Sequence, residues 1–425
     1  MLSFEVCAMA CICVSGGRFL NGEIEIQGSK NAVLPMLAAA LLIPGETRFR
    51  NCPDIADVRA MAALLKKLGA VVSRDKDMLC VDATYVHPVF LDCGDMADTR
   101  GCILLLGALT ARFLEAHLAH PGGCVIGARP VDLHLLALRA LGVEIEEGEV
   151  ILAKAAKLTA SEVVFPVPSV GATQNAILAA VLAEGRTGLH NVAREPEVVH
   201  LCHFLNAAGA KISGIGTAHL LVEGVKQLSP VDYTVPSDRI VAGTYMAAVL
   251  SSGGKVFLRG ADDAELLAVI KPLRAAGAEF GIYADGILVK KGRRLAAFDY
   301  IRTQPYPGFP TDMQSQFVAL ATLADGVCVI EETIFEARFK VVPELIKMGA
   351  RIYLDENKAV VEGVMTLAGA NLCGKDLRGT AALVIAALAA EGESTITGTE
   401  YLERGYEDFV GGLKGLGADI KRVVK

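Results

Sequence analysis

The sequence lacks several features that would place it in other classes of protein. It contains no tryptophan, and aromatic residues make up only 6% of its 425 residues, so its core must be mainly aliphatic. The longest charge-free apolar stretches, residues 32–44 and 381–390, are shorter than the roughly 18 residues that a membrane-spanning helix needs. These stretches are typical of buried helices, and we expect no membrane partner.

There is also no excess of basic residues. The chain has 41 lysines and arginines against 48 aspartates and glutamates, which gives a formal net charge of −7. Binding to nucleic acid uses a surplus of cations that neutralises phosphates, so the composition argues against a nucleic-acid partner. It does not exclude a small anionic ligand, since such a pocket needs only a few arginines.

Sequence motifs of several common chemistries are missing too. No GxxxxGK[ST] loop, GxGxxG turn, HExxH or CxxC pair occurs, so P-loop hydrolysis, nicotinamide chemistry and structural zinc lose their usual support. His200 and His203 share a helix face, but no third ligand is near them in sequence, so we expect no metal site. The eleven cysteines without a CxxC pair indicate reduced thiols in a cytoplasm rather than a disulfide framework. The first 19 residues lack a basic segment and a clear cleavage site, and we interpret them as a strand.

What the sequence does have is a repeat that runs through the whole chain. A helix-like segment, a glycine, an alanine or valine, and a strand-like run recur six times, as in KKLGAVV and RAAGAEF. Glycine accepts the left-handed backbone conformation that ends a helix, so each glycine predicts a helix end followed by a strand. The six glycines, 67 to 73 residues apart, are Gly69, Gly142, Gly209, Gly277, Gly349 and Gly417.

A second recurrence lies about halfway between these glycines. An Ala/Leu-rich helix ends there and a strand follows, least clearly in the second repeat, around LGALTARFLEAHLA. This alternation of helix and strand predicts an α/β fold, and six units of about 70 residues fit two lobes of three units each. The alternative is a generic doubly wound α/β protein in which the glycine triplets recur by accident.

One glycine-rich segment, PGGCVIGARPVDLH, contains a candidate nucleophile. Three glycines surround Cys124, which predicts a loop that leaves its thiol accessible. Arg129, five positions further on, would lower the pKa of that thiol and favour a reactive thiolate. The alternative interpretation is a small apolar residue in a turn.

Two other segments place charge at the start of a helix. Ser29 is a plausible helix N-cap with Lys30 and Asn31 in the first turn, an arrangement that suits a phosphate or carboxylate. Three prolines fix the backbone ahead of Asp312, whose carboxylate would then lie at a helix start. A solvated lysine and simple helix capping are the alternatives.

Several arginines stand in otherwise apolar or small contexts at the ends of helix-like runs. Singly, each is typical of a surface residue, but together with Lys30 and Arg129 they could form a convergent anion site in an acidic chain. These arginines are Arg100, Arg338, Arg378 and Arg404.

The chain resembles the enolpyruvyl transferases. The segments that carry the resemblance, in order from about residue 26 to the C-terminus, are GSKN, PGGCVIGARPVDLH, SVGAT, REPE, PSDRI, FPTDMQ, DLRG and ERGYE. The resemblance implies two lobes, each with three units around a pseudo-threefold axis, and an active site in the cleft between them. It implies a first lobe over residues 29–236 and a discontinuous second lobe over 1–28 plus 237–425, with a double crossover near Lys30.

The resemblance also implies an activity. The expected reaction transfers the enolpyruvyl group of phosphoenolpyruvate to the 3′-hydroxyl of UDP-N-acetylglucosamine and releases phosphate, without a metal or organic cofactor. This is the first committed step of peptidoglycan synthesis, and the antibiotic fosfomycin is the expected inhibitor. One alternative is the shikimate-pathway transferase of the same fold, which lacks the cysteine loop. Another is a catalytically silent relative that binds the UDP-sugar, against which the intact Cys124, Asp312 and Lys30 argue.

The roles of individual residues follow from the same resemblance. Cys124 would be the general acid and the covalent residue, Asp312 the base near the sugar hydroxyl, and Lys30 and Arg404 would hold the donor. The sequence departs from the usual pattern at Val167, Val241 and Ala337. The other substrate-binding positions implied are Asn31, Arg100, Arg129, Pro130, Val131, Asp132, Leu133, Ser169, Val170, Gly171, Ile334, Arg338 and Arg378.

Overall fold

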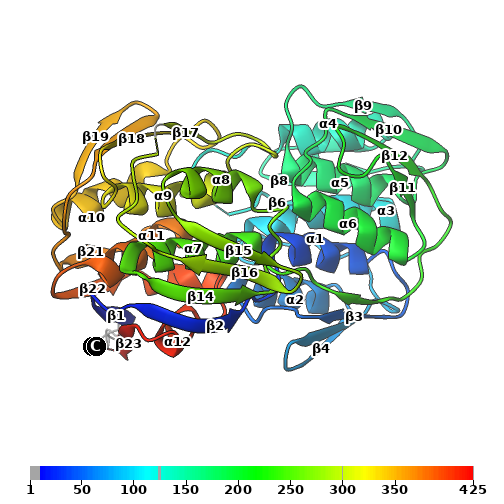
Figure 1. Cartoon of the computed structure of the whole chain (residues 1–425). Coiled ribbons are helices and arrows are strands. Elements are labelled where there is room, and N and C mark those ends of the chain that lie inside the picture. Colours follow the sequence, from blue (N-terminus) through cyan, green and yellow to red (C-terminus); the bar gives the residue numbers. More distant parts are fainter. Residues whose placement is uncertain (1–9, 123–125, 299, 425) are drawn as a thin grey trace, which may run out of the picture.

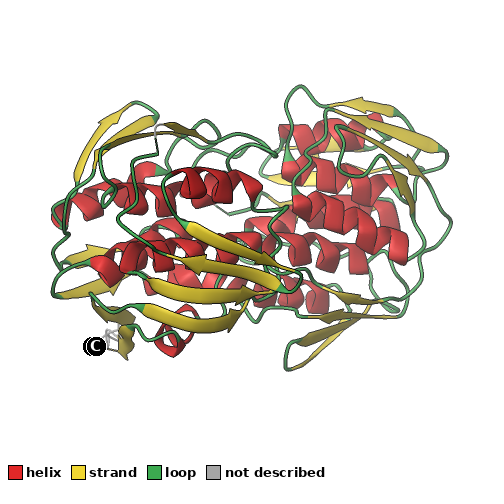
Figure 2. Ribbon diagram, viewed as in Figure 1, coloured by secondary structure: helices red, strands yellow, loops and turns green. Residues whose placement is uncertain are grey.

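The structure is a computed structural model that describes residues 10–122, 126–298 and 300–424. Two groups of helices and sheets lie side by side in it (Figures 1 and 2). Within these ranges, none of the helices combines the length and the hydropathy that a membrane crossing requires. The mixture of helices with several small sheets confirms the predicted α/β class.

Each of the two groups has a hydrophobic core of its own. One core takes its buried side chains from the stretch between Ala32 and Val235. The other combines side chains between Ile12 and Ile26 with side chains between Ile240 and Ile420. We therefore propose residues 29–236 as a first lobe and 1–28 plus 237–425 as a second lobe, the division expected from the sequence.

Three helices in each lobe, here called the inner helices, are buried on nearly every side. In the third of them, every residue from Ala172 to Ala180 is buried. A helix surrounded by protein has no face that needs polar residues, which explains the long Ala/Leu/Val-rich runs of the sequence. The inner helices are α1 (Lys30–Ala40), α3 (Leu104–Phe113), α5 (Val170–Ala180), α7 (Arg239–Ser252), α9 (Gln314–Ala321) and α11 (Leu377–Ala389).

Six outer helices alternate with the inner ones along the chain. Each is followed by one of the six repeat glycines, whose φ lies between +90° and +102°, and the next strand begins two residues after that glycine. The helix ends predicted from the repeat are thus confirmed at all six positions. The outer helices are α2 (Ala56–Lys67), α4 (Asp132–Ala140), α6 (Pro196–Ala207), α8 (Leu267–Ala275), α10 (Val342–Lys347) and α12 (Phe409–Gly415).

The described strands form six small sheets, one for each repeat. Five sheets have four strands, and in each of them one edge strand is parallel to its neighbour, while the remaining neighbouring pairs are antiparallel. The sixth sheet has three strands, and a parallel bridge between Leu91 and Leu118 takes the place of the parallel edge strand.

The sheets of the first lobe are, in strand order, β13 (Asp232–Thr234), β3 (Glu46–Arg50), β5 (Met78–Asp82), β4 (Val71–Asp75); β6 (Glu115–Ala119), β8 (Val150–Lys154), β7 (Glu144–Glu147); and β9 (Glu162–Val164), β10 (Arg186–His190), β12 (His219–Glu223), β11 (Lys211–Ser213). Those of the second lobe are β2 (Leu20–Glu25), β14 (Gly254–Arg259), β16 (Gly286–Lys290), β15 (Glu279–Tyr283); β17 (Tyr300–Arg302), β18 (Val327–Glu331), β20 (Lys358–Glu362), β19 (Arg351–Asp355); and β21 (Asn371–Cys373), β22 (Glu393–Thr397), β1 (Ala10–Ser15), β23 (Asp419–Val424).

The N-terminal strands complete the second lobe. β1 pairs with β22 and β23, and β2 pairs with β14, so the strand predicted near the N-terminus is confirmed for Ala10–Ser15. The chain then crosses into the first lobe and later returns. The two crossing segments lie side by side at a bridge between Gly28 and Ser237, next to Lys30.

The second repeat was the one in which the sequence pattern is least clear, and its backbone shows the reason. A glycine with positive φ stands just before or at the start of the strand that follows the inner helix in the other repeats, for example Gly45 before β3. In the second repeat this position is occupied by Leu114, with φ of 60°, immediately before β6. The conformation is retained although the residue that signals it is absent.

Replacing one of the repeat glycines by alanine should destabilise the protein through its backbone alone. Gly349 has φ of +91°, and a Cβ added there would meet nothing within 4 Å, so Gly349→Ala should cost about 1–2 kcal/mol through conformational strain. Gly415→Ala, within α12 and equally open, is the control and should be neutral or stabilising by up to about 1 kcal/mol. Chemical denaturation of both variants measures the difference, and equal stabilities would contradict this account.

Candidate active site

Charged side chains from both lobes meet beside the crossover. Lys30 Nζ, at the start of α1, lies 2.7 Å from Asp57 Oδ2 in the first turn of α2. Arg404, at the end of the 3-10 helix η4 (Thr399–Arg404) of the second lobe, donates from Nε to Asp57 Oδ1 at 2.9 Å. Only 4% of the Asp57 side chain is exposed. Asp57 therefore joins a lysine at the crossover to an arginine of the second lobe.

The charges of this group depend on one another. Burial lowers the pKa of Lys30, and Arg378 and Arg404 lower it further, while Asp57 acts in the opposite direction. Burial alone would raise the pKa of Asp57, but Lys30 and Arg404 hold it below its usual value. Asp57 is consequently ionised at neutral pH, and Lys30 loses its proton more readily than an exposed lysine does.

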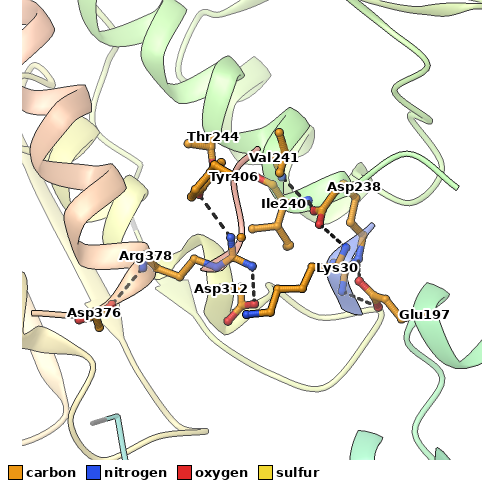
Figure 3. Close-up of polar contacts among 12 residues, drawn as sticks. Lys30, Glu197, Asp238, Ile240, Val241, Thr244, Asp312, Asp376, Arg378 and Tyr406 are labelled. Carbon is orange, nitrogen blue, oxygen red and sulfur yellow. Dashed lines mark hydrogen bonds and ion pairs between the residues drawn. The ribbon is translucent and has the colours of Figure 1, made fainter. Parts of the chain in front are cut away.

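A second carboxylate, Asp312, lies between two arginines. It belongs to the short 3-10 helix η2 (Thr311–Met313), and Arg378 Nη2 lies 3.0 Å from its Oδ2 while Arg338 Nη2 contacts its Oδ1. Burial would raise the pKa of Asp312, but Arg378 and Arg338 outweigh it and hold that pKa far below the usual range. Figure 3 shows the Lys30 side chain facing Asp312, so the two charged groups belong to one site.

Arg378 is fixed from both of its ends. Its backbone N–H donates to the side chain of Asp376, the N-cap of α11, at 3.0 Å. Its guanidinium donates to the Tyr406 hydroxyl at 3.3 Å, and that hydroxyl contacts the Thr244 hydroxyl at 3.0 Å (Figure 3). The DLRG and ERGYE segments of the sequence therefore meet at this arginine.

The crossover itself is held by buried carboxylates. Asp238 is the N-cap of α7, and its two oxygens accept from the backbone N–H groups of Ile240, Val241 and, at 3.0 Å, Lys30 (Figure 3). Because Val241 contributes its backbone here, its departure from the usual pattern leaves this contact intact. Nearby, Glu197 of α6 forms a bidentate pair with Arg239 of α7, with N–O distances of 2.9 and 3.2 Å.

Cys124 lies outside the described residues, but both flanks of its loop are described. Arg100, in the 3-10 helix η1 (Arg100–Ile103), donates to the carbonyl oxygens of Pro121 at 3.3 Å and Gly122 at 3.4 Å. It also donates to the carbonyl of Arg129 on the other flank. Arg100 thus braces the loop on both sides, a role that the sequence did not suggest.

The far flank of the loop contacts the second lobe close to Asp312. The guanidinium groups of Arg129 and Arg338 lie over the Phe335 ring, 5.5 and 5.1 Å from its centroid. The backbone N–H of Ala337 donates to the carbonyl of Ile126 at 3.0 Å. Ala337 acts here through its backbone, so its departure from the usual pattern also leaves a contact unchanged.

Glu332 organises the second-lobe side of this contact, and sequence reasoning missed it. It is 3% exposed and accepts from the hydroxyls of Thr303 at 2.9 Å and Thr311 at 2.8 Å. It also accepts from the N–H groups of Ile334 and Phe335. One buried carboxylate therefore fixes both the residue before Asp312 and the turn that presents Ile334, whose surface is 36% exposed.

The segments RPVDLH and SVGAT pack against each other at the starts of α4 and α5. Ser169 caps α5 by accepting from Ala172 N–H at 3.4 Å, and a Cβ on Gly171 would lie 2.9 Å from the His134 ring. Burial lowers the pKa of His134 to about 4, so its ring is neutral and contacts the Asn175 amide at 2.6 Å. The other predicted positions around these helix starts are exposed Pro130 and Asp132, buried Val131, half-buried Leu133 and Val170; Asn31 lies half-buried beside Lys30.

The site is defined by converging charges. Two surface cavities, of about 270 and 460 Å³, lie elsewhere: they are lined by residues such as Arg186 and Lys255 and by none of the residues of the candidate site. Among the described residues, no group of three or more histidine, cysteine, aspartate or glutamate side chains could hold a metal ion. What the arrangement can do is bind an anion and accept a hydrogen bond at Asp312.

Comparison with known proteins gives consistent results. A family model described as EPSP synthase (3-phosphoshikimate 1-carboxyvinyltransferase) matches residues 14–413. A relative from Caldanaerobacter subterraneus subsp. tengcongensis, named UDP-N-acetylglucosamine 1-carboxyvinyltransferase 2, is 44% identical over 97% of this chain and 99% of its own length. A relative from Dichelobacter nodosus, named UDP-N-acetylglucosamine 1-carboxyvinyltransferase, is 46% identical over 96% of this chain and 98% of its own length.

Solved structures agree with these relatives. The enolpyruvyl transferase NikO from Streptomyces tendae is similar over 98% of this chain and all of its own, with a TM-score of 0.89 and 26% identity. An EPSP synthase from Acinetobacter baumannii has the same coverage with a TM-score of 0.76, and at 20% identity it supports the fold alone.

Removing the Asp312 charge should destabilise the second lobe. Asp312→Asn leaves the buried Arg338 and Arg378 without their carboxylate, so we expect a loss of about 3 kcal/mol at neutral pH. The folded-state pKa of Asp312 is depressed, so its contribution is present above the unfolded pKa of about 4 and is lost as pH falls below it. Chemical denaturation of the unchanged protein and of Asp312→Asn should therefore show a difference in the free energy of unfolding that becomes smaller as the pH falls.

Asp325→Asn is the control, because it removes an exposed ion pair with Arg294 and should cost less than about 1 kcal/mol. A difference between Asp312→Asn and the unchanged protein that does not vary with pH would contradict the assignment.

Proposed function

The chain belongs to the EPSP synthase family of enolpyruvyl transferases, and on this premise we propose that it transfers the enolpyruvyl group of phosphoenolpyruvate to UDP-N-acetylglucosamine. The acceptor atom is the 3′-hydroxyl and the second product is phosphate. The curated relatives carry the name of this activity, which favours it over the shikimate-pathway reaction. The reaction would be the first committed step of peptidoglycan synthesis and would take place in the cytoplasm.

The convergence of cations at the crossover is the observation that carries the proposal. Phosphoenolpyruvate has a phosphate and a carboxylate, so its site needs several fixed cations. An acidic chain brings Lys30, Arg404 and Arg378 together at the junction of its lobes. Arg129, on the flank of the cysteine loop, would add a fourth cation to the donor site.

The acceptor would lie along the first lobe. The N-terminal ends of α4 and α5 pack against each other through Gly171 and His134, and helix N-termini favour the negative charge of a diphosphate. Arg129 and Asp132 near the start of α4, with Ser169 at the start of α5, would hold the uridine diphosphate part. The exposed Ile334 would pack against the sugar.

The reaction would proceed by addition and then elimination. In the addition, Cys124 gives its proton to the methylene carbon of phosphoenolpyruvate, the sugar oxygen bonds to the neighbouring carbon, and the hydroxyl proton passes to Asp312. In the elimination, the resulting methyl group returns a proton to the Cys124 thiolate, the double bond forms again, and phosphate leaves with the electron pair of the broken C–O bond. In a side reaction, the Cys124 thiol adds across the donor double bond: its sulfur bonds to the carbon that carries the phosphate group and its proton goes to the methylene carbon, which gives a phospholactoyl adduct.

Asp312 is a weak base in the arrangement described here. With both arginines bound, its pKa is far below neutral, so it is an ionised acceptor for the hydroxyl hydrogen bond. We propose that the anionic groups of the donor share the charge of Arg378 and so raise the basicity of Asp312 when the substrates are present.

The proposed reaction is tested by measuring phosphate release from phosphoenolpyruvate with different acceptors. We expect release with UDP-N-acetylglucosamine and none with shikimate 3-phosphate. Release with shikimate 3-phosphate would favour the shikimate-pathway alternative. Binding of the UDP-sugar without any release would favour a catalytically silent protein.

Treatment with fosfomycin should modify Cys124 and block turnover. Arg129 and the nearby cations should favour its thiolate, and UDP-N-acetylglucosamine should speed the modification by organising the anion site. Mass spectrometry of the modified protein locates the adduct. Cys124→Ser should lose most of the activity, because a hydroxyl is a far weaker acid, whereas Cys124→Asp should keep much of it and resist fosfomycin.

The other cysteines provide internal controls for this experiment. Among the cysteines that the structure describes, Cys93 and Cys373 are exposed, so a merely accessible thiol would be labelled there as well. Burial raises the pKa of Cys102 and Cys202 to about 12, so neither should react. Label on Cys93 or Cys373 instead of Cys124 would remove Cys124 from the catalytic role.

A further inference from the structure

Asp57 is a buried carboxylate whose contacts are not explained by the helix that carries it. The N-cap of α2 is Ile55, which has no side-chain cap, and Asp57 follows in the first turn. Its oxygens are directed instead to the cations of the site: Oδ2 lies 2.7 Å from Lys30 Nζ, and Oδ1 accepts from Arg404 Nε at 2.9 Å. A second contact, from Arg404 Nη2 to Asp57 Oδ2 at 3.4 Å, makes the ion pair between Arg404 and Asp57 bidentate.

These contacts join three parts of the chain that are far apart in sequence. Lys30 lies at the crossover, Asp57 belongs to the first lobe, and Arg404 is 347 positions further on, in the second lobe. Asp57 contacts both the Lys30 ammonium and the Arg404 guanidinium, and its negative charge offsets the repulsion between these two cations. Asp57 supplies that charge with a side chain that is 4% exposed.

We propose that Asp57 is a positioning residue for the donor: its carboxylate holds the Lys30 ammonium and the Arg404 guanidinium side by side, across the two lobes, where the anionic donor binds. This inference rests on the proposed function, because it takes Lys30 and Arg404 as the donor's cations. Asp57 itself need not touch the donor, since both of its oxygens are engaged by the two cations.

The proposal has a consequence for pH. The charged groups that face Lys30 are Asp57 from α2, Arg404 from η4, Arg378 from α11 and Asp312 from η2. Asp238 of α7 accepts from its backbone N–H. Burial and the two arginines lower the pKa of Lys30, and Asp57 opposes them. Without the Asp57 charge, that pKa falls, so Lys30 loses its proton, and with it its hold on the donor, at a lower pH than in the unchanged protein.

The first test is the pH dependence of the Asp57→Asn variant. Asparagine keeps the shape and removes the charge, so the alkaline limb of kcat/KM for phosphoenolpyruvate should move down by about one pH unit, which is about tenfold in activity on that limb. The KM for UDP-N-acetylglucosamine should change less than twofold. A decrease in kcat/KM for phosphoenolpyruvate that is equal at every pH would overturn the proposal, because a merely structural ion pair predicts it. A change confined to the KM for UDP-N-acetylglucosamine would overturn it as well.

The second test does not depend on turnover. In protein labelled at the lysine side-chain nitrogen and carbon, nuclear magnetic resonance follows the titration of Lys30, whose signal is identified by its absence from Lys30→Arg. The midpoint should be lower in Asp57→Asn than in the unchanged protein, and an unmoved midpoint would overturn the proposal. If the unchanged protein releases no phosphate from phosphoenolpyruvate, the proposed function fails, whereas the Lys30 titration still decides the role of Asp57.

Two further variants keep these tests interpretable. Asp54→Asn removes a carboxylate three positions away that pairs with Arg59 at 2.9 Å on the surface, and neither the alkaline limb nor the Lys30 midpoint should move. Asp57→Glu keeps the charge and should leave the Lys30 midpoint close to that of the unchanged protein. It serves also if Asp57→Asn does not fold, because a lowered midpoint in Asp57→Glu would contradict the role of the carboxylate charge.

Discussion

The carboxylate of Asp238 is the point on which the arrangement of the two lobes depends. It starts α7, the first inner helix of the second lobe, and it also accepts the N–H of Lys30 at the start of α1 in the first lobe. One buried side chain thereby sets where both helices begin. Arg404 of η4 and Arg378 of α11 both lower the pKa of Lys30, and α11 packs against both η4 and α7.

The fold could be predicted from the sequence because its signals are local. The turn from each outer helix into a strand requires positive φ, and glycine marks it at all six repeats. The second recurrence, at the ends of the inner helices, is weakest where Leu114 adopts positive φ without a glycine. Pairing across the lobes has no such local signal, and the division of the chain at residues 29 and 236 came from the family resemblance rather than from the repeat.

The site was predictable in part. The residue pattern predicts that the arginines are surface residues singly or a convergent anion site together, and the resemblance decides for the site. The contacts of Arg338 and Arg378 with Asp312 have no signal in the sequence. Asp57 was missed because an acidic residue in the first turn of a helix is ordinarily explained by the helix dipole. Glu332, Phe335 and Tyr406 were missed for a related reason: their partners are backbone groups, guanidinium groups and hydroxyls that come close only after folding.

The position of β1 and β2 has a consequence for how the chain is made. These strands are synthesised before the first lobe, yet β2 pairs with β14, and the backbone N–H of Lys255, 234 positions later, donates to Asn21. The partners of β1 are β22 and β23, at the very end of the described chain. The first lobe can therefore complete its core during synthesis, while the second lobe keeps unpaired strand edges until β22 and β23 have been synthesised. The lobe that supplies Asp312 and Arg378 is thus the later one to form and the one more exposed to aggregation on the way.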